Sequence, residues 1–462
     1  MAKSKNIDML HGSLWDKMVI FALPLALTGM LQQLYNAADV AVLGKFVGTT
    51  AMAAVGNNIA IIGIIVNLFL GLSLGGNVII ARFIGAKQRE RAQAALHTAF
   101  VLALIIGFSM AIIGQIAAGA IIEWLQVPSE VEEMAETYLR VYLLGMPLLA
   151  LYNFQSAIFR AQGDTRTPLM ALMVSSMSNV IMDLLFVQLG LGVAGVALAT
   201  DLSNGISSGI LCWKLLHAKE GLRLQLSKLR PERVLLKNII KIGLPAGIQG
   251  MVFSISNILI QAAINSLGPD AMAASAAAFT IEINVYCFLN AFAQATTTFV
   301  SQNYGAGNMA RCLMVTKRGM MLALGSTMGM AVLVLLLSQQ LLGFFNPDAN
   351  VIALGTVRLW YIVAPEFLQV FIDVFSGALR GYGYSLGPAI LTLVGICGVR
   401  IIWLYSVFAV YSTYDVLMAC YSISWLVTGA MIVGMYIHYR GKILELIQIK
   451  LKSMNFMLKL QL

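Results

Sequence analysis

The chain has 462 residues, of which 59% are hydrophobic and only 11% are charged, and its mean hydropathy is +0.83. Because soluble proteins of this length carry roughly a quarter charged residues, this composition excludes an ordinary soluble enzyme and predicts many membrane spans. The formal net charge of +9 does not predict a nucleic-acid partner, because membrane topology and anionic lipid explain basic residues of this kind.

Apolar runs of about 20–30 residues alternate with turn-forming sequences such as LGLGVAG and FNPDAN, which is typical of tilted transmembrane helices rather than barrel strands. The predicted fold is therefore an all-α integral membrane protein. We predict twelve spans, at residues 17–43, 52–82, 92–122, 132–161, 168–188, 193–217, 236–266, 270–302, 312–343, 351–381, 386–410 and 414–438.

The basic residues predict the orientation of these spans. Twenty-six of the 30 lysines and arginines fall in the two tails or on one set of loops, whereas the opposite loops are short and mostly acidic. By the positive-inside rule, we expect both termini in the cytoplasm of a bacterial cell and the spans in its cytoplasmic membrane.

The two halves of the chain repeat each other at an offset near 220 residues. GLPAGIQGMVFSISN (243–257) matches ALPLALTGMLQQLYN (22–36), and ALRGYGYSLGP (378–388) matches IFRAQGDTRTP (158–168). Each half has six spans, an even number, so both halves start on the same side of the membrane. We therefore expect two six-helix lobes related by a pseudo-two-fold axis along the membrane normal, facing a central cleft.

The lobe boundaries follow from the repeat and from a long basic stretch between the halves. We predict an N-terminal lobe at 1–217, a cytoplasmic linker at 218–235, a C-terminal lobe at 236–440 and a cytoplasmic tail at 441–462. The glycine-rich LGLSLGGN (70–77) predicts close helix packing rather than a phosphate loop, because it follows no strand and has no lysine.

The order and spacing of these motifs through twelve spans resemble the MATE family, the multidrug and toxic compound extrusion transporters. The proline entry of each half, IGAKQRERA, FRAQGDTRTP, SNVIMD and ALAT carry the resemblance over nearly the whole chain. It implies a prokaryotic secondary transporter of the DinF-like or NorM-like branch. Such a protein exports organic cations or amphiphilic drugs by alternating access, is not an enzyme and needs no cofactor besides its coupling ion.

Acidic residues inside the apolar runs are the main functional candidates, because each costs about 2.5–3.5 kcal/mol to insert at the bilayer centre. Gln32, Asn36 and Asp39 share one face of the first span, and Asn179 and Asp183 share one face of the fifth. Both acids lie in the outer half of the bilayer, at a depth similar to that of Thr200. Two carboxylates, an amide and a hydroxyl can therefore meet in the first lobe.

This oxygen-rich set suits either of two ions. Hard oxygen ligands suit sodium, whereas two close carboxylates that cannot both ionise cheaply can share a proton. The family resemblance implies that Asp39, Asn179, Asp183 and Thr200 couple transport to cation entry, and we add Asn36 from the Asp39 face. A buried network that only fixes helix register remains the alternative. Asp201 follows Thr200 but points about 100° away around its helix, so it stays outside the predicted site.

The second lobe offers weaker candidates. Asp373 lies in the tenth span, where NorM-like members carry a cation-binding acid, but the matching acid of their seventh span is missing here. Glu282 is either a counter-charge for cationic substrates or a partner in a local ion pair. Arg140 is expected to pair with Glu136, and Arg400 needs a partner that the sequence does not name.

Substrate contacts are predicted from the methionines, aromatic residues and amides expected near the cleft, because methionine repacks around varied shapes. The predicted substrate-binding residues are Gln32, Tyr35, Asn153, Gln249, Met251, Phe253, Asn257, Glu282 and Asp373.

Other functions are less favoured by the sequence. A wide cationic cavity and extra helices would favour a lipid-linked oligosaccharide flippase of the same superfamily. A membrane-embedded lipid transferase would need a polar catalytic cluster at the membrane surface. We expect small-molecule drugs or organic cations and membrane lipid as partners, and a monomeric protein.

Overall fold

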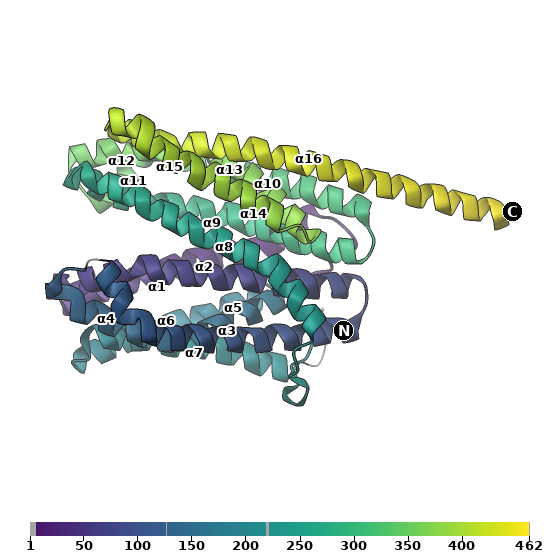
Figure 1. Cartoon of the computed structure of the whole chain (residues 1–462), viewed down its shortest axis with the longest axis horizontal. Coiled ribbons are helices and arrows are strands. Elements are labelled where there is room, and N and C mark those ends of the chain that lie inside the picture. The colour runs from purple at the N-terminus through teal and green to yellow at the C-terminus, as the bar shows by residue number, and fades with distance from the viewer. Residues whose placement is uncertain (1–5, 126, 219–220, 462) are drawn as a thin grey trace. The chain divides into compact units, whose positions relative to one another are not determined.

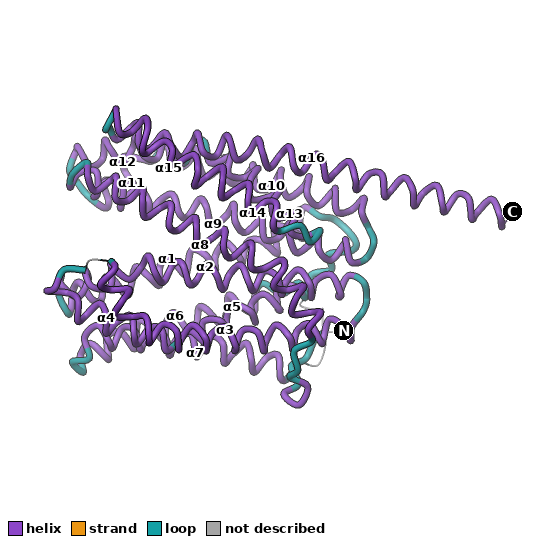
Figure 2. The backbone as a smooth tube through the Cα atoms, viewed as in Figure 1, coloured by secondary structure: helices purple, strands orange, loops and turns teal. Residues whose placement is uncertain are grey.

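The computed structural model describes the backbone of residues 6–125, 127–218 and 221–461, and their side chains apart from those of 49, 57, 60 and 446–461. In this part of the chain the regular structure is entirely helical, without a strand (Figure 2). The α-helices are α1 (Trp15–Phe46), α2 (Thr49–Gly85), α3 (Arg89–Trp124), α4 (Ser129–Leu144), α5 (Met146–Ala161), α6 (Arg166–Gln188), α7 (Gly192–Leu216), α8 (Arg233–Ser266), α9 (Pro269–Gly305), α10 (Met309–Leu336), α11 (Ser338–Phe345), α12 (Ala349–Ile362), α13 (Glu366–Gly381), α14 (Leu386–Thr392), α15 (Val399–Trp403) and α16 (Tyr414–Gln461).

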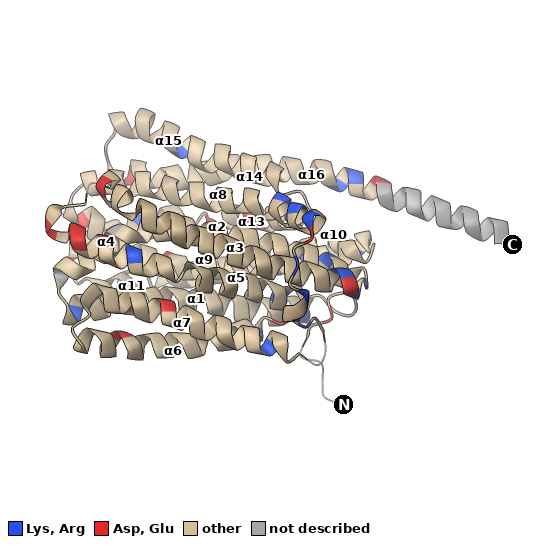
Figure 3. Cartoon of the chain, turned by 60° about the horizontal axis from the view of Figure 1, so that its bottom comes forward, with Lys and Arg blue, Asp and Glu red and all other residues tan. Residues whose placement is uncertain are grey.

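Helices long and apolar enough to cross a membrane confirm the predicted membrane fold. Among the described residues nine segments qualify alone, and eleven qualify if each of two bent helix pairs is one span. The remaining predicted span corresponds to α7, a 25-residue helix that carries several serines, Thr200 and Asp201. Figure 3 shows that charged residues concentrate toward helix ends and that the middle stretches of the helices are largely uncharged.

Two predicted spans are bent rather than continuous. The span at 132–161 consists of α4 and α5, which meet at an angle of 49°, and the span at 351–381 consists of α12 and α13, which meet at 41°. Each bend lies beside a proline, Pro147 or Pro365. Proline has no backbone N–H and crowds the preceding turn, so the regular helix is interrupted there.

The eleventh span contains two π-helical segments. Leu393–Gly398 and Leu404–Phe408 lie on either side of the short helix α15, which carries Arg400. Such segments appear mostly as single wide turns inside α-helices and are frequent at functional sites.

The chain forms two compact units, which we call unit 1 and unit 2. Unit 1 contains Leu23–Ile84 and Gln88–Ile255, and unit 2 contains Met9–Ala22 and everything from Ser256 onward, with smaller pieces in each. Helices α1 and α8 therefore each contribute to both units. The lobes expected from the repeat instead keep each of these helices within one lobe. Those boundaries stay a prediction.

Unit 1 is held together by apolar clusters and by close glycine contacts. Buried residues of α2, α3, α5 and α8 form one core cluster, and buried residues of α2, α4 and α7 form much of another. Gly71 and Gly75 of α2 pack so closely against α8 that a Cβ atom on either glycine would overlap backbone atoms of Gly247 or Ile239. This confirms the close packing predicted from LGLSLGGN.

Unit 2 ends in α16, a 48-residue helix that continues past the predicted twelfth span and extends beyond the other helices of its unit (Figure 1). The core of unit 2 includes buried residues of α9, α10 and α12. Asp348 starts α12 by accepting hydrogen bonds from the backbone N–H groups of Asn350, at 2.8 Å, and Val351, at 3.3 Å. These are the contacts of an N-cap, which satisfies N–H groups that the first helical turn leaves open.

Candidate functional site

A buried carboxyl group lies at the centre of unit 1. Asp39 belongs to α1 and is only 5% exposed. Its Oδ2 atom accepts a hydrogen bond from the hydroxyl of Thr200, at 3.1 Å, and Thr200 belongs to α7. Helices that are far apart in sequence therefore share one polar contact in the apolar interior.

Asp183 and Asn179 of α6 complete this cluster, and both are fully buried. Their side chains lie close enough to interact with the carboxyl group of Asp39. Among the described residues, however, Asp39 Oδ1, both oxygens of Asp183 and both amide atoms of Asn179 form no hydrogen bond of ordinary geometry. The four side chains predicted to meet do meet, and five of their polar atoms are left unsatisfied. We call these four residues the Asp39 site.

Unsatisfied buried polar atoms are costly, so the Asp39 site has a strong physical demand for a bound cation. Leaving a buried polar group unpaired costs about 1–3 kcal/mol, and more if it is charged. Two carboxylates, an amide oxygen and a hydroxyl are hard ligands that suit sodium, and a shared proton would neutralise one carboxylate instead. The donor set fits either ion.

Three tyrosines line the Asp39 site. The hydroxyl of Tyr35 donates to the backbone carbonyl of Thr200, at 3.4 Å. Tyr138 and Tyr142 of α4 are buried, stack at a centroid distance of 6.0 Å and lie near the Asp39 carboxyl group. The sequence analysis missed Tyr138 and Tyr142, although their i, i+4 spacing near the start of the predicted span 132–161 was a usable signal.

The other predicted residues of unit 1 lie outside the Asp39 site or beside it. Asn36 is exposed and, within the described part of the chain, forms no hydrogen bond to the site. Asn153 is buried and donates to the carbonyl of Leu149 in its own helix, at 2.9 Å. The remaining predicted substrate residues are half-buried: Gln32, Tyr35, Gln249, Met251 and Phe253. Their roles stay predictions.

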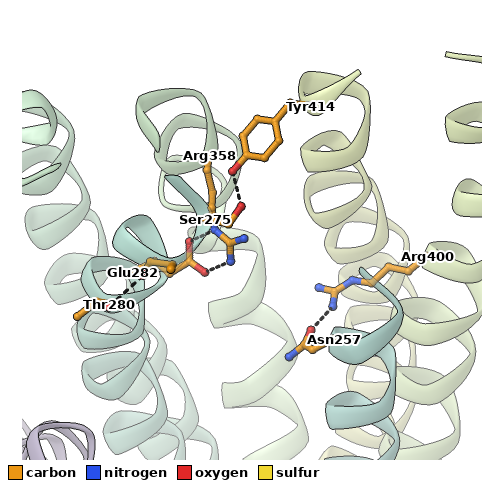
Figure 4. A network of polar contacts seen from close by, with 8 residues as sticks. Asn257, Ser275, Thr280, Glu282, Arg358, Arg400 and Tyr414 are labelled. Atoms are coloured by element: carbon orange, nitrogen blue, oxygen red, sulfur yellow. Dashed lines mark hydrogen bonds and ion pairs between the residues drawn. The ribbon is translucent and has the colours of Figure 1, made fainter. Parts of the chain in front are cut away.

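Glu282 of unit 2 forms a buried ion pair. Both of its oxygens accept hydrogen bonds from Arg358, at 2.6 and 3.1 Å, and the two side chains are about 10% and 5% exposed (Figure 4). The sequence predicted either a substrate counter-charge or a local ion pair for Glu282, and this bidentate contact is such an ion pair. The carboxylate is thus already neutralised by a fixed cation.

Arg400 is fully buried, and its partners are now visible. Its guanidinium donates to Asn257 Oδ1, at 3.1 Å (Figure 4). It also donates to the hydroxyl of Ser424, at 3.2 Å. The ring of Tyr421 lies 4.2 Å from the guanidinium carbon, a cation–π distance. Asn257 therefore holds Arg400, and its substrate contact stays a prediction.

A row of polar residues follows one face of α13. Asp373 accepts a hydrogen bond from Gln369, at 3.3 Å. Glu366 lies one turn further back, is 3% exposed and has one oxygen without a hydrogen-bond partner among the described residues. The sequence analysis missed Glu366, although an acid directly after a proline in an apolar run marked it. The predicted role of Asp373 stays a prediction.

Comparison with known proteins identifies the family. The MatE family model matches residues 24–185 and 245–406, which is the internal repeat at an offset of 221 residues. The chain is 27% identical to a probable multidrug resistance protein NorM of Thermotoga maritima (83% of this chain, 84% of the relative) and 27% identical to a probable multidrug resistance protein YpnP of Bacillus subtilis (86% and 89%).

A solved structure has the same fold. It is described as the outward-facing conformation of a multidrug resistance MATE family transporter of the MOP superfamily. The two structures superpose with a TM-score of 0.87 at 24% sequence identity. The superposition covers 97% of this chain and 100% of the solved chain. A family match over both repeats, together with this shared fold of two six-helix lobes, shows that the chain belongs to the MATE family of multi-span membrane transporters.

Proposed function

We propose that this protein exports organic cations or amphiphilic drugs by alternating access, in exchange for sodium ions or protons that bind at the Asp39 site. Relatives named as multidrug resistance proteins support the substrate class. The observation that carries the coupling proposal is the pair of buried, unsatisfied carboxyl groups of Asp39 and Asp183.

The Asp39 site acts in this proposal as a switch of charge. With a cation bound, the pair of carboxylates is neutralised and tolerates an apolar, closed environment. Without the cation, the charges are stable only where water reaches them, because ionised groups in an apolar interior are very costly. Cation binding therefore favours one conformation of the transporter over the other.

This preference couples the cation to the drug. A ligand shifts a conformational equilibrium only by its difference in affinity between the two states, and the coupling is reciprocal. Cation entry from outside then lowers drug affinity on that side and releases the drug. The cation-bound protein then turns inward, releases the cation and binds another drug molecule. Its return to the outward conformation without the cation completes the cycle.

The proposed location is the cytoplasmic membrane of a bacterium, with both termini in the cytoplasm. The basic loops support this orientation by the positive-inside rule. In this orientation the Asp39 site lies in the outer half of the membrane, where an inward gradient of sodium or protons supplies the cation.

The test is drug transport by the purified protein in liposomes, with a sodium gradient and a pH gradient imposed separately. We expect one gradient to drive ethidium efflux in the wild type. Asp39→Asn and Asp183→Asn should lose at least about 90% of the gradient-driven rate, because each removes one charge of the pair.

Asp16→Asn is the matched control, because Asp16 is an exposed aspartate in the first turn of the same helix α1. It should transport like the wild type. Full gradient-dependent efflux by Asp39→Asn would exclude the Asp39 site as the coupling site. Wild-type efflux without any gradient would exclude secondary transport altogether.

A further inference from the structure

The bend between α4 and α5 needs a partner because it interrupts a membrane span. Regular helix stops at Gly145, and the Gly145 N–H donates to the carbonyl of Tyr142, at 3.2 Å, in a tightened turn. Pro147, two residues later, supplies no N–H. In an apolar interior, backbone groups released by such a break must be satisfied by neighbouring helices.

Asp201 of α7 is the side chain that lies against this bend. It is 7% exposed, and its carboxylate packs so closely on Gly145 that a Cβ atom at position 145 would overlap Oδ1. The backbone N–H of Gly145 is within reach of the same carboxylate. Gly145 has an ordinary φ of −78°, so it is the carboxylate, rather than the backbone conformation, that requires a glycine here.

A side chain of a neighbouring helix also lies at the bend of unit 2, but there it donates a hydrogen bond instead of accepting one. Ser422 lies in the last span of the second half, as Asp201 lies in the last span of the first half, close to the position that an offset of about 220 residues predicts. The Ser422 hydroxyl donates to the carbonyl of Tyr361, at 2.7 Å, immediately before the bend between α12 and α13. In a regular helix this carbonyl would accept from residue 365, but Pro365 has no N–H. Ser422 supplies the missing hydrogen bond.

The bend of unit 1 also touches the Asp39 site. Tyr142 lies three residues before Gly145 and packs in one apolar cluster with Leu43, one turn after Asp39, and Val196, one turn before Thr200. Its phenol is within electrostatic range of the carboxyl groups of Asp39 and Asp201. Helix α7 connects the Asp39 site and the bend through two consecutive residues. Thr200 donates a hydrogen bond to Asp39, and Asp201 packs against the bend at Gly145. The position of the bend therefore affects one wall of the Asp39 site.

We propose that Asp201 is a positioning residue that holds the α4–α5 bend and thereby keeps Tyr142 against the Asp39 site. Cation affinity then depends on this bend, and cation binding in turn stabilises it. The inference rests on the proposed function for its effect on transport, whereas the effect of Asp201 on the bend is independent of that function.

The test combines transport with hydrogen exchange of peptides that cover residues 140–150, in the full chain. Asp201→Ala should speed exchange in these peptides. It should also raise the cation concentration for half-maximal transport about 10-fold, the equivalent of one hydrogen bond to a charged group, with a smaller change in maximal rate. Asp201→Asn keeps an acceptor oxygen and should recover most of both values.

Two further variants separate this role from general damage to the fold. Gly145→Ala adds the Cβ atom that the Asp201 carboxylate excludes, and it should change exchange and half-saturation in the same direction as Asp201→Ala. Ser422→Ala releases the equivalent bend of unit 2 and should leave cation half-saturation at the wild-type value. If Asp201→Ala does not fold, Asp201→Asn and Gly145→Ala provide the same comparison.

The outcomes are distinct. Wild-type exchange at 140–150 in both Asp201→Ala and Gly145→Ala would overturn the assignment of Asp201 to the bend. Faster exchange with unchanged cation half-saturation would overturn its link to the Asp39 site. Failure of the proposed coupling site itself would appear separately, as intact gradient-driven efflux by Asp39→Asn.

Discussion

The Asp39 site of unit 1 and the Glu282–Arg358 pair of unit 2 hold buried acids in different ways. In unit 1, Asp39 and Asp183 face each other, and most of their oxygens have no partner among the described residues. In unit 2, Glu282 is held by both arms of Arg358. A buried carboxylate paired with an arginine is already neutralised, whereas a buried carboxylate beside another carboxylate needs a bound cation to neutralise it. This difference supports the proposed ion exchange at the Asp39 site and a structural role for the Glu282–Arg358 pair.

The largest effect is expected from breaking the buried pair of unit 2. Arg358→Met leaves the Glu282 carboxylate buried without its partner and should cost about 3–5 kcal/mol of stability. The double variant Glu282→Leu/Arg358→Met should recover most of this loss, because it leaves no uncompensated charge. Thermal unfolding of the purified protein in detergent measures both. A single variant as stable as the double variant would show that Glu282 finds another partner.

A smaller effect, of opposite sign, is expected from adding the coupling cation. A ligand that binds only the folded protein stabilises it by about 1.4–2.7 kcal/mol at concentrations about 10 to 100 times its Kd. Sodium, or acid pH if the ion is a proton, should therefore raise the unfolding temperature of the wild type. The variant Asp39→Asn/Asp183→Asn should lose this gain, and Glu282→Leu/Arg358→Met should keep it. Loss of the gain in both would remove the distinction between the units.

The smallest effect is expected from a partly exposed pair of unit 1. Arg140 contacts Glu136 at 2.6 Å, one helical turn apart, but the two side chains are 42% and 32% exposed. Glu136→Gln removes the ion pair but leaves the hydrogen bond from Arg140 to the carbonyl of Gln115. It should change stability by only about 0.3–0.5 kcal/mol, because water screens such pairs. The same unfolding measurement applies. A cost close to that of Arg358→Met would mean that distance, rather than burial, decides the strength of these pairs.

Short-range patterns predicted much of this molecule. The twelve spans follow from apolar runs, the repeat from matched motifs, and the meeting of Asp39, Asn179, Asp183 and Thr200 from helical spacing and depth. Glu136 and Arg140, four residues apart, were predicted to pair, and the ion pair confirms it.

Contacts between distant segments were less predictable. Glu282 and Arg358 are 76 residues apart, and nothing local selects one arginine over another. Asp201 was left outside the site because its angle on the helix pointed away from Thr200. The angle was informative, but its target, the bend at Gly145, exists only once α4, α5 and α7 are packed. Glu366 was missed because it follows a break in a span that had been treated as continuous.

The π-helical segments around Arg400 have a consequence for how the eleventh span tolerates changes in length. A wide turn of this type accommodates one residue more than a regular turn while keeping the helix faces before and after it aligned. Deleting one residue inside Leu393–Gly398 would therefore convert the segment to regular α-helix and leave Arg400 facing Asn257 and Ser424. The same deletion in an uninterrupted span would rotate everything beyond it by about 100°. This span can therefore lose one residue without changing which side chains face its neighbours, and its length is less strictly fixed than that of a regular helix.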